Sequence, residues 1–204
     1  MNLRRVKTTS LAESRKNEII DAALKLFAQE GYHSTTLDEV AAVVGVSKAT
    51  LYYYFRNKEE IIKAILNRSL ERMKQTLEIS KSPLSNREKL CQFIEYHVVF
   101  AADSAELARI TFEQLNILPK RSREVVKRKQ REVVTLLQDL LQQGIDEGSI
   151  SVDNTQLAAF AIIGMCNWTY HWYRPEGKLT PRHIADMYVK LLENGYLIKA
   201  PPTK

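Results

Sequence analysis

The stretch from Thr36 to Glu60 reads TLDEVAAVVGVSKATLYYYFRNKEE and is the most informative part of the chain. Thr36 and Glu39 have the spacing of a capping box, which predicts a helix beginning at Leu37. Apolar residues then recur at helical spacing until Gly45, a residue suited to ending a helix and turning the chain. Ser47 is placed to cap a following helix. Two short helices joined by a glycine turn indicate a helix-turn-helix, whose second helix enters the major groove of DNA.

Outside this stretch, the helical pattern continues in both directions. A second capping box at Ser10 predicts a helix from Leu11 to about Glu30, preceded by a flexible basic arm at residues 1–9. Asn57 is placed to cap a helix that runs to about Glu78. Pro119, Gly148 and Pro181 mark boundaries of later segments. We expect further helices over about 86–102, 105–118, 121–147, 155–173 and 181–192, and therefore an all-α fold.

Size and composition leave room for two small domains. The chain has 204 residues, 45% of them hydrophobic, and only seven glycines, so it can bury a core. Its net charge of +6 and isoelectric point near 9.2 permit nucleic-acid binding without establishing it. We place an N-terminal domain at residues 10–65 and a second, larger helical domain at residues 66–199.

The two cysteines and the apolar segments indicate the compartment. Cys91 and Cys166 lack metal-ligand spacing, so we expect two small apolar residues in a reducing compartment, and no metal or other cofactor. The segment before Leu11 is polar and basic, unlike a signal peptide. The longest apolar stretch, Leu157–Cys166, is shorter than the roughly 20 residues that a membrane span needs. These features predict a soluble cytoplasmic protein with no membrane partner.

Several short motifs together resemble a known family. They are Ala22-Ala23-Leu24-Lys25-Leu26-Phe27, Gly31-Tyr32, Thr35-Thr36, Val40-Ala41, the run from Gly45 to Phe55, and Asn57-Lys58-Glu59-Glu60. In this order and spacing, residues from about Lys16 to Ile65 are similar to the DNA-binding domain of TetR-type transcriptional regulators. The resemblance implies a homodimer, an all-helical ligand-binding C-terminal domain, and a double-stranded DNA operator with two-fold symmetry.

The helix after Gly45 carries the residues expected to contact DNA. Lys48 can donate to guanine or to a phosphate, and Thr50 can contact a thymine methyl or a base edge. The hydroxyls of tyrosines on this helix suit phosphate oxygens, although such tyrosines can also be core or ordinary surface. Helix starts favour anions, which adds Thr36 and Lys58. The predicted DNA-binding residues are Thr36, Ser47, Lys48, Ala49, Thr50, Tyr52, Tyr53 and Lys58, with Arg4 and Arg5 of the arm in a minor groove or adding nonspecific attraction.

The second domain contains a cluster of aromatic and soft residues that predicts an effector pocket. Apolar pockets lie between the helices of bundles, but the same residues can equally be core packing. His97 and Asn167 are polar groups on largely apolar faces, and either can be a satisfied core residue instead. The predicted ligand-binding residues are Phe93, Tyr96, His97, Phe100, Phe112, Met165, Asn167 and Trp168.

A basic run from Lys120 to Arg131 is either a solvated helix face or a phosphate grip for an acyl-coenzyme A thioester. The segment from Asn167 to Gly177, with Leu179-Thr180-Pro181, resembles the C-terminal domain of TetR-type repressors of fatty-acid, steroid or aromatic-acid breakdown. Many of those respond to coenzyme A thioesters. Our preferred effector is therefore an acyl-CoA, and a drug, a bile acid or a free fatty acid remains an alternative.

The last two predicted helices resemble the dimer surface of the same family. The residues expected there are Ala158, Ile162, Ile184, Met187, Tyr188 and Leu191. Two other classes of protein are alternatives. An enzyme is disfavoured because the chain lacks a nucleophile elbow, a P-loop, a dinucleotide fingerprint and a metal motif. A helical partner-binding protein without an operator would show absent or sequence-independent DNA binding. The preferred reading is a ligand-responsive, sequence-specific transcriptional repressor.

Overall fold

The computed structural model describes residues 3–112 and 115–194, with side chains described from residue 11 onward except at residue 117. Within these residues the regular structure is entirely helical, as the sequence predicts. The chain divides into two compact units. The first comprises Met1–Glu71 and Glu106–Lys127, and the second comprises Arg72–Ala105 and Arg128–Lys204.

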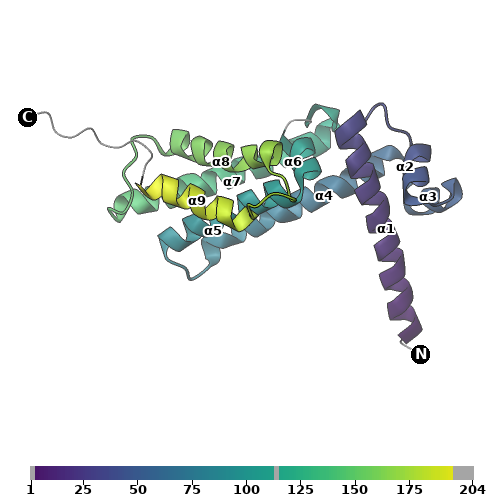
Figure 1. Cartoon of the computed structure of the whole chain (residues 1–204), viewed down its shortest axis with the longest axis horizontal. Helices are drawn as coiled ribbons and strands as arrows, with labels where there is room; N and C mark the ends of the chain where they lie inside the picture. The colour runs from purple at the N-terminus through teal and green to yellow at the C-terminus, as the bar shows by residue number, and fades with distance from the viewer. Residues whose placement is uncertain (1–2, 113–114, 195–204) are drawn as a thin grey trace, which may run out of the picture. The chain divides into compact units, whose positions relative to one another are not determined.

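The first unit is built on α1 (Leu3–Glu30), α2 (Leu37–Val44), α3 (Lys48–Tyr54) and most of α4 (Lys58–Leu77) (Figure 1). It also contains α6 (Ala105–Phe112) from Glu106 onward, the 3₁₀ turn η2 (Leu115–Ile117) and the first residues of α7 (Lys120–Asp146). The apolar faces of α1 to α4 supply its core. Its most completely buried side chains include Ile19, Phe27, Val40, Leu51, Ile61, Ile62 and Ile65.

The turn between α2 and α3 has the geometry that its residues predict. The Thr36 amide donates to Glu39 Oε2 at 2.6 Å, and the Glu39 amide donates to Thr36 Oγ1 at 3.2 Å, which completes the capping box. Gly45 has φ +72° and donates its N–H back to α2. Ser47 Oγ then accepts from the Thr50 amide at 3.1 Å. Thus each helix start and the glycine stop between them are confirmed.

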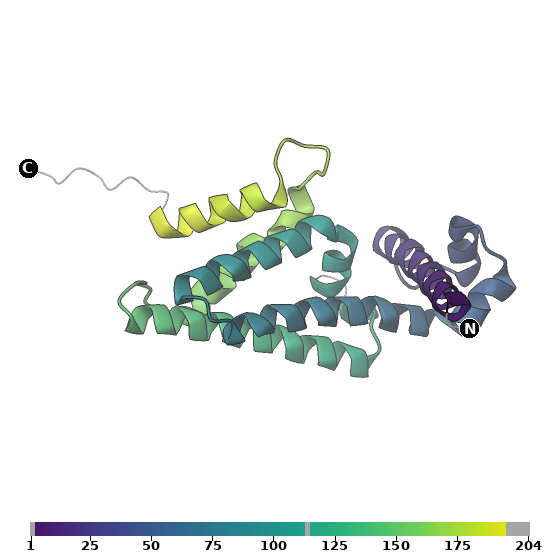
Figure 2. The same cartoon turned by 90° about the horizontal axis from the view of Figure 1, so that it is seen from below.

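The second unit contains the 3₁₀ turn η1 (Glu78–Lys81), α5 (Asn86–Asp103), most of α7, α8 (Thr155–Trp172) and α9 (Pro181–Asn194). Helix α5 packs against both α8 and α9 (Figures 1 and 2). Two ion pairs also join α9 to α5: Arg182 donates to Glu95 at 2.8 Å and Arg87 donates to Glu193 at 2.7 Å. Because these pairs are largely exposed, buried apolar contacts stabilise the unit far more than they do.

Two helix boundaries differ from the sequence prediction. Helix α1 begins at Leu3 rather than Leu11. Ser10 lies inside it, so the predicted cap there is wrong. No glycine or proline interrupts residues 3–30, so residues before a capping-box pattern can simply continue the helix. We expected a flexible arm over residues 1–9, whereas the backbone is helical from Leu3 onward.

The second difference is at α6, which ends at Phe112 rather than Leu118. Residues 115–117 form a 3₁₀ turn, closed by the Leu118 N–H donating to the Leu115 carbonyl at 3.2 Å. Pro119 disfavours helical backbone at the residue before it, which explains why α-helix does not continue to Leu118.

Each unit is made of two separate segments of the chain, whereas the sequence analysis places one boundary between residues 65 and 66. Residues of α6 and early α7 join the first unit, although α5 precedes them in the second. The buried hydroxyls of Ser69 on α4 and Thr111 on α6 lie 3.0 Å apart, and Thr111 also donates to the Leu107 carbonyl at 2.6 Å. This polar contact ties α6 to α4 within the first unit.

The described part of the chain shows neither a membrane-spanning helix nor a cluster of metal ligands. None of its helices is both long and apolar enough to cross a membrane. In the same residues, no three or more His, Cys, Asp and Glu side chains are grouped so as to hold a metal ion.

The Gly45 turn can be tested by substitution. Gly45→Ala should lower the free energy of unfolding by about 1 kcal/mol, because an L-residue with a Cβ is disfavoured at positive φ. Gly45→Asn should cost less, since asparagine tolerates this conformation better. Urea denaturation of the three proteins measures both effects. Equal stability of all three would contradict the requirement for glycine.

Candidate DNA-binding interface and effector region

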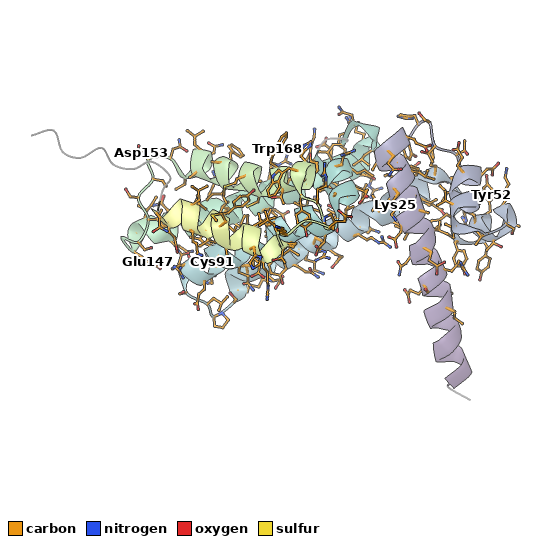
Figure 3. All side chains as sticks on the ribbon, viewed as in Figure 1. Lys25, Tyr52, Cys91, Glu147, Asp153 and Trp168 are labelled. Carbon is orange, nitrogen blue, oxygen red and sulfur yellow. The ribbon has the colours of Figure 1, made fainter. Side chains whose placement is uncertain are left out.

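Helix α3 presents one buried and one exposed face. Leu51 is fully buried, whereas Tyr53 is 83% exposed and Tyr52 43% exposed. Lys48 and Ala49 are exposed as well. Figure 3 labels Tyr52 on this helix. The arrangement is that of a recognition helix, held by its apolar face and free to meet DNA with the other.

Lys48 is engaged by a neighbouring acid. Its Nζ lies 2.9 Å from Asp38 Oδ2, and both side chains are about 60% exposed. The hydrogen bond and charge of Asp38 raise the pKa of Lys48. Asp38, which the sequence analysis did not single out, therefore partly neutralises the cation nearest the start of α3. An acidic residue in the first turn of a helix is the sequence pattern from which Asp38 could have been identified.

Lys58 occupies a different environment from the one that the sequence suggested. Its Nζ donates to three backbone carbonyls between α1 and α2: Tyr32 at 2.5 Å, Thr35 at 2.7 Å and His33 at 3.2 Å. It also lies 4.7 Å from the centre of the Tyr32 ring, within cation–π range. The half-buried ammonium thus holds the α1–α2 connection against the start of α4. Its contact with DNA remains a prediction.

A shallow depression lies among the starts of α2, α3 and α4. Its volume is about 350 Å³, and its lining includes Thr36, Lys48, Tyr52, Arg56 and Lys58. Helix N-termini and cations both favour phosphate oxygens. Arg56 was absent from the predicted DNA contacts, although a basic residue directly before the Asn57 cap could have indicated it. Arg4 and Arg5 lie in the first turns of α1, but their side chains are outside the described residues.

The predicted effector residues divide into distinct environments. Phe93 and His97 on α5 are stacked, with ring centroids 4.2 Å apart. His97 Nδ1 lies 3.1 Å from the Phe93 carbonyl oxygen. Burial lowers the pKa of His97 from 6.5 to about 4, so the ring is neutral near neutral pH.

Asn167 on α8 contributes an unsatisfied acceptor. Its Oδ1 is buried and has no hydrogen-bond partner among the described residues. A buried carbonyl oxygen without a donor costs free energy.

The remaining predicted effector residues do not share one environment. Phe100 is buried and Met165 half-buried, whereas Tyr96 is 36% exposed. Trp168 is 60% exposed and lies against His171, with ring centroids 3.9 Å apart; Figure 3 labels it on α8. Phe112 belongs to the first unit. Helical periodicity explains the spread within α5 and within α8, because only one face of a helix can be turned to the core.

The predicted dimer residues also differ in exposure. Met187 is 57% exposed, whereas Ile162 and Ile184 are buried within the chain at 6% and 4%. Tyr188 is half-buried, with its hydroxyl 3.4 Å from that of Thr169. Ala158 and Ile162 line a cavity of about 550 Å³ in the second unit. Two further apolar side chains of α8 are exposed, Leu157 at 66% and Phe160 at 50%.

The fold and the exposed α3 face define a helix-turn-helix DNA-binding protein with a separate helical unit. Sequence comparison agrees with this class. Residues 19–65 match the family described as bacterial regulatory proteins, tetR family, and residues 83–196 match the tetracyclin repressor-like C-terminal domain. The chain belongs to the TetR family of transcriptional regulators, whose members are repressors and other DNA-binding regulators rather than enzymes.

Three similar proteins illustrate the range. The transcriptional repressor KstR2 of Mycolicibacterium smegmatis is 27% identical over 92% of this chain and 93% of its own. The fatty acid metabolism regulator protein of Bacillus subtilis is 28% identical over 87% of this chain and 93% of its own. The crystal structure of AibR in complex with isovaleryl coenzyme A and operator DNA has a TM-score of 0.74 and 27% identity, covering 87% of this chain and 97% of AibR.

Replacing Lys58 should destabilise the fold. Lys58→Met keeps much of the apolar stem but removes the donor to three carbonyls, so the free energy of unfolding should fall by about 2 kcal/mol. Lys63→Met on the same helix is the control. It breaks an exposed pair with Glu59, and should cost about 0.5 kcal/mol or less. Equal losses in urea denaturation would show that the carbonyl contacts contribute little.

The buried histidine predicts a pH dependence of stability. The unfolded chain protonates His97 near pH 6.5, whereas the folded chain does so only near pH 4. Stability should therefore be full above pH 6.5 and decline as the pH falls to 4, by about 3 kcal/mol in total. His97→Gln should lose this part of the decline, and the exposed control His183→Gln should keep it. Denaturant titrations at several pH values measure the difference; identical profiles for all three proteins would contradict the assignment.

Proposed function

We propose that this chain is a ligand-gated repressor that binds a two-fold symmetric operator as a homodimer and is released by an acyl-CoA thioester. The regulator class follows from the family; the effector and the individual contacts are our proposal. The observation that carries the effector part is the unpartnered, buried Oδ1 of Asn167 on α8. A ligand bearing a hydrogen-bond donor, such as an amide N–H of a pantetheine arm, would satisfy it.

On the DNA side, we propose that the Tyr53 hydroxyl on α3 contacts a phosphate. Tyr53 is 83% exposed, the highest value among the large hydrophobic residues described in the first unit. Lys48 and Thr50 are proposed to read base edges, with Lys48 released from Asp38 when DNA approaches. Ser47, Ala49 and Thr36 allow close approach at the helix starts. Each recognition helix of the dimer would occupy one major groove, with the two half-sites one helical turn or a multiple apart.

The basic face of α7 suits the phosphates of coenzyme A. Lys127 and Arg131 are one helical turn apart, exposed, and without an acid at ion-pair distance in the described residues. By contrast Lys129 is paired with Glu132 at 2.5 Å. Unpaired cations on one helix face can attract phosphate at a smaller desolvation cost than buried ones.

Relatives support this effector class. AibR has been crystallised with isovaleryl coenzyme A and operator DNA. The Bacillus subtilis relative is named as a regulator of fatty acid metabolism. Both align over most of their own length, so their effector regions are included. A different apolar ligand, such as a drug, a bile acid or a free fatty acid, is the alternative, and the test below separates it.

We further propose that α4 and α6 carry the signal between effector and DNA. Helix α4 is continuous from Lys58 to Leu77, with residues in both units. The Ser69–Thr111 contact couples it to α6, which directly follows α5 in the chain. A ligand that favours one arrangement of these helices would shift the DNA affinity by a coupling of about 1–3 kcal/mol.

For the dimer, we propose that α8 and α9 form the surface between subunits. Their exposed apolar residues, including Phe160 and Met187, would be covered by the same surface of a second copy. Such self-complementary contacts suit two-fold symmetry. We propose that Tyr188 and Leu191, which are half-buried on α9, contribute to the edge of this surface.

The test is a fluorescence-anisotropy titration on the DNA upstream of the protein's own gene. We expect tight, salt-sensitive binding, which isovaleryl-CoA or a longer acyl-CoA reduces at least fivefold while coenzyme A alone and the free acids do not. Arg131→Gln should weaken the thioester response, whereas Lys190→Gln, with the same charge change on α9, should not. Tight binding that no thioester affects would reject the acyl-CoA effector, and absent or sequence-independent DNA binding would reject the operator. Tyr53→Ala should weaken binding to all DNA sequences alike.

A further inference from the structure

The second unit contains a cavity that is separate from the predicted effector residues. Its volume is about 550 Å³, within the range of small-molecule sites. It is enclosed by α5, the end of α7, the segment Ser149–Val152, α8 and α9. Aliphatic side chains make most of the lining, among them Leu90, Ile94 and Val189. None of the eight predicted effector residues lines it.

Backbone geometry at the end of α7 builds one wall of this cavity. The amides of Ser149 and Ile150 both donate to the Gly144 carbonyl, at 2.9 and 3.0 Å. Gly144 is required here, since a Cβ on it would lie 2.4 Å from Ile150 Cδ1 and 3.0 Å from the Asn86 amide nitrogen. The Gly144 backbone therefore lies in close contact with the side chains of Ile150 and Asn86, which both line the cavity.

One polar atom of the lining lacks a partner. Asn86 is only 9% exposed, and its Nδ2 donates to the Leu140 carbonyl at 3.0 Å. That bond fixes the orientation of the amide, and leaves Oδ1 buried with no hydrogen-bond partner among the described residues. A buried acceptor of this kind is costly unless a donor reaches it. The cavity thus has a mainly apolar lining that includes one residue, Asn86, with an unpartnered acceptor.

The charged residues of the lining already neutralise each other. Arg87 and Glu193 meet at 2.6 Å on the exposed side of the cavity. Burial raises the pKa of the Cys91 thiol, so this group is neutral as well. The lining therefore offers a ligand no unpaired charge, and an ionic ligand would lose its hydration without compensation.

We propose that this cavity is a second small-molecule site, which takes an uncharged, mainly aliphatic ligand whose hydroxyl or N–H donates to Asn86 Oδ1. The proposal is independent of the acyl-CoA effector, because it rests on different residues. A coenzyme A thioester is excluded from this site by its charge. Ala158 and Ile162 of α8 belong to the lining, so the ligand would contact a helix of the proposed dimer surface from inside the subunit.

Two isomeric probes test the hydrogen bond. Decan-1-ol can donate to Asn86 Oδ1, whereas methyl nonyl ether has the same atoms but no donor. Titrations of the full chain, observed through ¹³C-labelled isoleucine methyl groups, should shift Ile94, Ile150 and Ile162 with both probes. The alcohol should bind about tenfold more tightly. Equal affinities would overturn the role of Asn86, and shifts confined to other methyl groups would overturn the site.

Paired variants test the location. Val152→Trp adds a bulky side chain in the lining and should reduce decan-1-ol binding by at least tenfold. Asp153→Trp places the same side chain on the neighbouring exposed residue and should leave binding unchanged. Circular dichroism checks that both proteins are folded. Should Val152→Trp bind like the parent chain, the site is refuted. Binding that appears only after removal of residues 195–204 would mean that the chain's own end is the occupant, and would refute a free ligand.

Discussion

The contact of one ammonium with three carbonyls joins the start of α4 to the connection between α1 and α2. Lys58 begins α4, and the carbonyls that it binds belong to the connection between α1 and α2. Three carbonyl oxygens of this short connection accept hydrogen bonds from one group. The ammonium of a lysine has the three N–H donors that this requires. The positions of α2 and α3 depend on this anchor, since α3 follows α2 after a turn at a single glycine.

The helices that join the two units are the proposed route between effector and DNA. Helices α4 and α7 each contribute residues to both units, whereas α6 lies in the first although α5 lies in the second. Continuous helices resist bending, because each bend breaks backbone hydrogen bonds. In the proposed mechanism, a displacement of the end of α4 in the second unit would be carried along the helix toward Lys58. The buried Ser69–Thr111 contact is where α6 can act on it.

The proposed ligand specificity of the second unit depends on a few polar atoms among apolar side chains. His97 stays neutral because burial penalises its charged form, and Asn86 and Asn167 each keep one amide oxygen without a partner. In a packed interior such atoms contribute instability unless a ligand satisfies them. Asn86 lines the cavity of the second unit, whereas Asn167 and His97 do not, so we propose two ligands of different chemistry.

Local chemistry in the sequence was sufficient for the helices and their caps. Thr36, Ser47 and Gly45 act within four residues of themselves, so their patterns predict the α2–α3 turn without knowledge of the rest. The same patterns failed at Ser10, where a continuing helix overrides a local cap. Only the tertiary structure could reveal that Lys58 binds distant carbonyls, that α6 joins the first unit, and that Asn86 faces a cavity. Those outcomes depend on residues far apart in the chain, and helical periodicity specifies which face is apolar but not which partner covers it.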